Sequence, residues 1–117
     1  MLWVSYGRVS QEGIQGMIKS PSNRAEAVAK LIEAYGGKLI SYHMLMNGEI
    51  DFFIVSDIPD DRVADVAIVN AMLVRGSGAI ETIATVPAVR AEDAMAQMQK
   101  AQQMAAEIGR ASCRERV

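Results

Sequence analysis

The chain contains few of the residues that build covalent frameworks or metal sites. Its 117 residues include one cysteine, Cys113, and one histidine, His43. A single cysteine cannot form an internal disulfide, and the sequence has no cluster of histidine and cysteine with metal-ligand spacing. No Ser-His-Asp set or nucleophile elbow is present either. We therefore predict no metal and no cofactor.

Long hydrophobic runs and an excess of positive charge are also missing. The apolar runs are far shorter than the roughly 20 residues that cross a bilayer, and no signal-peptide pattern follows Met1. The net charge of −2 provides no basic surface for nucleic acid. Half of the residues are hydrophobic, which is enough for the core of one small domain. We expect a cytoplasmic protein with no nucleic-acid and no membrane partner.

The last nine residues, Gly109 to Val117, form a polar segment without apolar periodicity. They resemble the in-frame translation of a common sequencing adapter. We expect a single domain at residues 1–106 and a non-native tail at 107–117, which is left out of the fold argument. A natural basic tail is the alternative.

Four segments have the composition of β-strands. They are rich in branched, aromatic and other apolar residues and span Leu2–Val9, Leu39–Met46, Phe52–Val55 and Ile80–Val86. Asn47-Gly48 separates the second from the third. Both residues tolerate the positive φ of a tight turn, so this pair predicts a β-hairpin.

Helical patterns fill the intervals between these strands. Asn23 and Glu26 resemble a capping box and begin one helix, and Pro59-Asp60-Asp61 begins another that ends at Gly76-Ser77-Gly78. The predicted apolar face of the first helix is Val28, Leu31, Ile32 and Tyr35, and that of the second is Val63, Ala67, Ile68, Ala71, Met72 and Val74.

The resulting order is βαββαβ, with only a weak helical turn expected over Ser10–Ser20 and a final helix over Ala91–Ala106. This order predicts an α+β, ferredoxin-like fold in which two helices cover one face of an antiparallel sheet.

The second and third predicted strands are apolar on both faces. Alternation places Ile40, Tyr42 and Met44 on one side of the second strand and Leu39, Ser41 and His43 on the other. One chain has too few helices to cover both faces of the sheet. We therefore expect a homodimer, or a higher homo-oligomer, in which sheets pack face to face.

Several short motifs resemble the GYD-domain family. The resemblance covers roughly Leu2 to Met98, and the matching motifs occur in the family's order: Ser10-Gln11-Glu12-Gly13-Ile14, Arg24-Ala25-Glu26-Ala27, Gly36-Gly37-Lys38, Gly48-Glu49-Ile50-Asp51-Phe52 and Pro59-Asp60-Asp61. Ile50 departs from the Gly-x-Tyr-Asp motif that names the family, whereas Gly48 and Asp51 match it. The resemblance implies a dimeric α/β barrel and no particular reaction, because fold alone is a poor guide to chemistry.

Two residues are candidates for catalysis. His43 is the only side chain whose unperturbed pKa lies near neutrality, so it could act as a base from a strand face, or it could simply be packed or lie at a dimer edge. Asp51 could orient a substrate or accept a proton, or it could accept backbone N–H bonds and fix the hairpin.

Three further residues are candidates for ligand binding. Arg8 and Tyr6 share one face of the first strand, and Ser41 shares a face with His43. Arg8 could instead pair with a carboxylate at the strand end. The predicted function is binding of an apolar small molecule in the barrel, with cofactor-independent oxygenase or isomerase chemistry. The alternative is a non-catalytic ligand-binding or assembly module.

Overall fold

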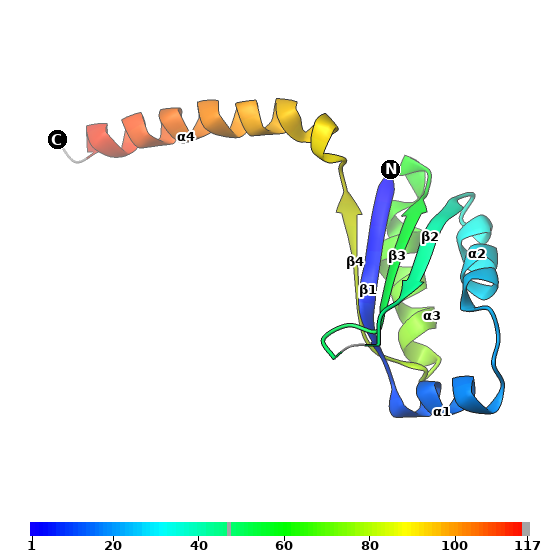
Figure 1. Ribbon diagram of the computed structural model, residues 1–117. Helices are drawn as coiled ribbons and strands as arrows, with labels where there is room; N and C mark the ends of the chain where they lie inside the picture. The colour runs from blue at the N-terminus through cyan, green and yellow to red at the C-terminus, as the bar shows by residue number, and fades with distance from the viewer. Residues whose placement is uncertain (47, 116–117) are drawn as a thin grey trace.

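The computed structural model describes residues 1–46 and 48–115. Its centre is a four-stranded antiparallel sheet in the order β2-β3-β1-β4 (Figure 1). The strands are β1 (Leu2–Val9), β2 (Lys38–Met44), β3 (Phe52–Asp57) and β4 (Ile80–Ala88). The two central strands are thus the first and the third in sequence. This confirms the predicted ferredoxin-like fold.

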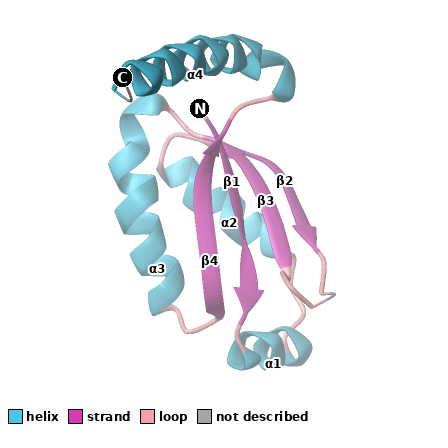
Figure 2. Cartoon of the chain, turned by 90° about the vertical axis from the view of Figure 1, so that its left-hand side faces the viewer, coloured by secondary structure: helices cyan, strands magenta, loops and turns pink. Residues whose placement is uncertain are grey.

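The helices of the described residues cover one face of this sheet and leave the other uncovered (Figures 1 and 2). The described helices are α1 (Gln11–Lys19), α2 (Arg24–Ala34), α3 (Ala71–Gly76) and α4 (Met95–Glu115). A 3₁₀ turn at Asp60–Arg62 and a π-helical segment at Asp65–Asn70 lead into α3, and a 3₁₀ turn at Ala91–Ala94 leads into α4. α2 and α3 form the layer on the sheet, while α1 lies across its lower end.

Capping side chains begin the first two helices. Asn23 begins α2 as predicted, but its side chain accepts a hydrogen bond from Ala25 N at 3.0 Å, and the reciprocal bond of a capping box is not among the described contacts. Ser10 accepts one from Gly13 N at 2.9 Å and begins α1, where the sequence predicted only a weak turn. A serine cap therefore offsets the low helix propensity of the two glycines in this segment.

The core lies between the helical layer and the facing side of the strands. One cluster joins Trp3, Ile32, Tyr35, Ile58 and Val66, and a second joins Val9, Phe52 and Ile54. Burial of these side chains is the main stabilising term of the domain.

The predicted core face of the second helical segment is wrong in part. Ile68 and Met72 are 59% and 70% exposed, whereas Val66 is 2% exposed. This segment has apolar residues on almost every side, so periodicity alone could not identify the buried stripe.

β2 contains a β-bulge, so the faces predicted for its first residues are wrong. The register with β3 shifts between Leu39 and Ser41, so Leu39 packs into the core together with Tyr42. Strict alternation had placed Leu39 on the same face as His43. One extra residue in a strand reverses the face of everything before it.

The hairpin between β2 and β3 is present, but its connection is longer than a two-residue turn. The backbone N–H of Leu45 donates to Asp51 O at 3.0 Å, and Gly48 has a φ of 122°. Asn47 lies outside the described residues, so its predicted part in a tight turn is not tested.

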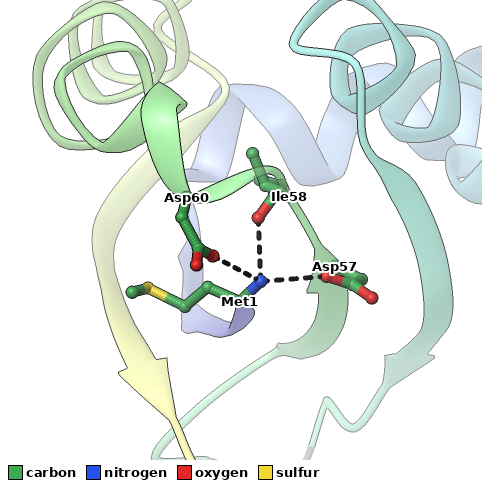
Figure 3. Close-up of polar contacts among 4 residues, drawn as sticks. All are labelled: Met1, Asp57, Ile58 and Asp60. Atoms are coloured by element: carbon green, nitrogen blue, oxygen red, sulfur yellow. Dashed lines mark hydrogen bonds and ion pairs between the residues drawn. The ribbon is translucent and has the colours of Figure 1, made fainter.

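The α-amino group of Met1 ties the upper end of β1 to the end of β3 (Figure 3). It lies 3.2 Å from Asp57 Oδ1 and 3.0 Å from Asp60 Oδ1, and donates to Ile58 O at 3.0 Å. These bonds, that to Asp60 foremost, raise the pKa of the amino group above its ordinary value.

α4 extends away from the rest of the domain on the side of the uncovered sheet face (Figures 1 and 2). It makes the longest dimension of the chain 68 Å, against 30 and 25 Å for the other two. Met95, Met98, Met104 and Ile108 on this helix are all at least half exposed. Within the described residues, no helix has the length and apolarity needed to cross a membrane.

Candidate functional site

Four of the five predicted site residues lie on the uncovered face of the sheet. Tyr6 is opposite Phe53, and Phe53 is opposite His43, so these three residues form a row across β1, β3 and β2. His43 is exposed and Ser41 is half-buried. Arg8 pairs with Glu81 at 3.8 Å between Nε and Oε2, which matches the ion-pair alternative of the sequence analysis.

Asp51 is separate from this group because its side chain is turned into the protein. It is 5% exposed and its Oδ2 accepts a hydrogen bond from Val9 N at 2.9 Å. Its own N–H donates to Gly7 O at 2.7 Å. Asp51 therefore fastens the β2–β3 connection to the end of β1, and a role for it in catalysis stays a prediction.

A cavity of about 270 Å³ lies on the other face, between the sheet and the α2 and α3 layer. Apolar side chains of α2 and of the α3 segment form its walls, including Val28, Leu31, Leu73 and Val74. Its floor is the sheet, with Phe52, Ile54 and Ile83 alongside Ser5, Ser56 and Thr85. None of the five predicted site residues lines it.

Small hydroxyl residues on the floor account for this cavity. Ser5 in β1 is opposite Thr85 in β4 and Ile54 in β3. Trp3 lies two residues before Ser5 on the same face of β1 and is opposite Ser56 in β3. Ser5 and Ser56 are 9% and 4% exposed, so they occupy positions where a core would normally hold large apolar side chains. The Ser5 and Thr85 hydroxyls bond to each other at 3.0 Å. The volume that these short side chains leave unfilled remains open beneath the helices.

Tyr35 lines the cavity, and its buried hydroxyl has no hydrogen-bond partner in the described structure. Its side chain is 7% exposed, and its hydroxyl is the one buried side-chain polar atom among the described residues that lacks a hydrogen bond. Burial, and secondarily the negative charge of Asp65, raises the pKa of this phenol. The hydroxyl is therefore protonated at neutral pH and can donate a hydrogen bond.

Arg24 is the single charged residue among the described residues that line the cavity. It is the first residue of α2 and is half-buried. Within the described chain, no carboxylate lies within 4.0 Å of its guanidinium. It also lines a shallower groove beside the cavity, which contains Glu12, Ser20 and Gly78. Arg24 was not among the predicted site residues.

The chemistry that this lining offers is recognition through hydroxyls, one cation and apolar surface. Among the described lining residues there is no histidine, cysteine, aspartate or glutamate. No cluster of three or more such residues that could hold a metal ion occurs in the described part of the chain. The signal that sequence reasoning missed was the pair of serines at inward-facing strand positions, Ser5 and Ser56.

No curated protein and no solved structure matches the chain. A family model described as the GYD domain matches residues 3–110, which is most of its length. The chain therefore belongs to the GYD-domain family.

Proposed function

We propose that this GYD-domain protein binds an apolar small molecule in the cavity between the sheet and helices α2 and α3. The observation that supports this is a preformed apolar cavity with a few polar groups, which is the usual character of a ligand site. Its volume of about 270 Å³ is close to the lower limit of roughly 300 Å³ for such sites, so we expect one small ligand per chain.

The lining favours the non-catalytic alternative over oxygenase or isomerase chemistry. A general base has to lie within hydrogen-bond reach of the proton that it removes and needs a pKa near the working pH. The titratable groups of the described lining are the phenols of Tyr35 and Tyr42 and the guanidinium of Arg24. None of these is a good base near neutrality. The exposed His43 lies on the opposite face of the sheet.

Binding can be tested with a neutral apolar dye, N-phenyl-1-naphthylamine, whose fluorescence rises in apolar surroundings. We expect saturable binding of one dye per chain. Val74→Phe should weaken this binding by filling the cavity from the α3 wall. Val63→Phe is the matched control, because Val63 is 43% exposed and does not line the cavity. Absence of saturable binding, or equal weakening by both substitutions, would contradict the proposed function.

We also propose that the chain forms a homodimer through the uncovered sheet face. The centre of this face is apolar and includes Val4, Tyr6, Phe53, Val55 and Val86, of which Tyr6 and Val86 are 37% and 41% exposed. Charged residues lie towards its two ends. Arg8 lies near Glu81 at one end, and Lys38 is opposite Asp57 at the other. An apolar centre with a charged rim is the anatomy of a protein interface.

The direction and composition of α4 favour a second copy as the partner on this face. The helix projects to the side from which that copy would approach (Figure 2). Only Lys100 is charged between Ala94 and Ala106. A helix surrounded by water on all sides normally carries many more charges. In a two-fold dimer, each α4 could contact the other subunit.

Sedimentation at micromolar concentration tests the dimer. We expect the wild-type chain to sediment as a dimer and Val86→Glu to shift it towards monomer, because the new carboxylate would be buried without a partner. Ile18→Glu, at a 76% exposed position on α1, should leave the sedimentation coefficient unchanged. A monomeric wild-type chain would contradict this proposal and leave the binding proposal intact.

A further inference from the structure

Two polar residues that line the cavity, Arg24 and Tyr35, lie at opposite ends of one helix. Arg24 is the first residue of α2, and Tyr35 is the residue that follows its last turn. At 1.5 Å per residue, the backbone between them spans about 16 Å. The cavity lining between them is mainly apolar and includes Ala27, Val28 and Leu31 on the same helix.

We propose that the ligand is an elongated amphipathic carboxylate, bound at its charged end by Arg24 and at its far end by the hydroxyl of Tyr35. This inference rests on the proposed function, since it names the ligand class of that cavity. The charged end lies at Arg24 because this residue is half-buried and borders an open groove, whereas Tyr35 is enclosed.

The arginine indicates an anionic end group. A planar guanidinium donates two parallel hydrogen bonds to a carboxylate, and the guanidinium of Arg24 has no carboxylate of the described chain within salt-bridge distance. Glu12 lines the groove beside it, so the local charge is close to balanced. A singly charged carboxylate therefore suits this place better than a doubly charged phosphate.

The tyrosine indicates a hydrogen-bond acceptor at the other end of the ligand. A buried hydroxyl without a partner is rare in native proteins and is costly unless a ligand or water accepts its hydrogen. The lining residues that belong to the same buried cluster as Tyr35 are Ile32, Ile58 and Val66, and they offer no acceptor in their side chains. An ω-hydroxyl, keto or ester oxygen on the ligand would complete the site.

The probes follow from this geometry. A twelve-carbon chain is comparable in length with α2, so we choose dodecanoate, 12-hydroxydodecanoate, dodecanol and dodecyl phosphate. Each is measured by displacement of N-phenyl-1-naphthylamine from the full chain. We expect 12-hydroxydodecanoate to bind most tightly and dodecanoate to bind at least about tenfold more tightly than dodecanol, as a charge-assisted hydrogen bond would give.

Two substitutions with matched controls assign the ends. Arg24→Gln should weaken both carboxylates at least about tenfold and leave dodecanol unchanged, while Arg90→Gln, an exposed arginine outside the cavity, should change nothing. Tyr35→Phe should abolish the advantage of 12-hydroxydodecanoate over dodecanoate, which is expected to be a few-fold to tenfold. Tyr6→Phe, on the opposite sheet face, should retain it.

The outcomes separate this inference from the proposed function. If dodecanol binds as well as dodecanoate, if dodecyl phosphate binds better, or if Arg24→Gln has no effect on dodecanoate, the carboxylate assignment is wrong although the cavity binds ligands. If Tyr35→Phe leaves the preference for the ω-hydroxyl intact, the assignment of the far end is wrong. If neither the dye nor any of the four probes binds, the proposed function itself fails.

Discussion

Replacing Tyr35 by phenylalanine should stabilise the ligand-free protein. The substitution removes the phenolic hydroxyl and keeps the ring that packs with Trp3, Ile32, Ile58 and Val66. A buried polar group without a hydrogen bond costs about 1–3 kcal/mol. Because the Tyr35 hydroxyl is buried and has no partner in the described structure, its removal should recover part of that cost.

We expect the free energy of unfolding to rise by about 1–2 kcal/mol in the Tyr35→Phe variant. For a domain of this size, 1 kcal/mol corresponds to an increase in Tm of about 4–8 °C. Urea denaturation can be followed through the fluorescence of Trp3, the single tryptophan of the chain, which is 5% exposed. Saturating 12-hydroxydodecanoate should reduce or reverse the difference, because the ligand then provides the missing acceptor for the wild-type hydroxyl.

Tyr6→Phe is the control for this measurement. The Tyr6 side chain is 37% exposed, so its hydroxyl can bond to water and the substitution should change stability by no more than about 0.5 kcal/mol. A loss of stability in Tyr35→Phe without ligand would refute the reasoning. It would show that the hydroxyl has a partner in solution, such as a buried water molecule.

Three further results are expected. Asp51→Asn should destabilise the protein by about 1.5–3 kcal/mol in urea denaturation, because the buried carboxylate that accepts from Val9 N loses its charge. Hydrogen bonds to Asp60 and Asp57 raise the pKa of the Met1 amino group in the folded chain above that in the unfolded chain, so the stabilising contribution of this group should be fully present below about pH 8 and be lost as the pH rises through the raised pKa. Urea midpoints between pH 7 and pH 10 measure this loss, and acetylation of the amino group should remove the pH dependence. Deletion of Gly109–Val117 should shift the Tm little, as differential scanning calorimetry can check, and a large decrease would show that the tail is recruited into an oligomer contact.

The topology could be predicted because strong local signals agreed with one another. β1 has the predicted bounds, and the helix start at Asn23 and the hairpin after β2 lie where the sequence placed them. Each signal depends only on neighbouring residues, such as a cap or a turn. The order of such elements then leaves few sheet topologies to choose from.

Features that depend on tertiary contacts were harder to predict from the sequence. The bulge between Leu39 and Ser41 has no marker of its own in the sequence, and it places Leu39 on the opposite face of the sheet from the one predicted. The buried stripe of the second helical segment was misassigned because Ile68 and Met72 are as apolar as Val66. In both cases several packings satisfy the local pattern, and only the complete structure selects one.

The same distinction explains why the sequence directed attention to the uncovered face and not to the cavity that we propose as the binding site. A titratable side chain such as His43 is visible in a sequence, whereas a cavity consists of volume that side chains fail to fill. That volume can be inferred only after the strand faces are known, because Ser5 and Ser56 are unusual only in that they face the helices.

His43→Ala separates a ligand site in the cavity from a ligand site on the uncovered face. The substitution should leave dye and carboxylate binding unchanged if the cavity is the site, since the histidine lies across the sheet from it. Loss of binding in this variant, with sedimentation unchanged, would instead assign the ligand to the uncovered face.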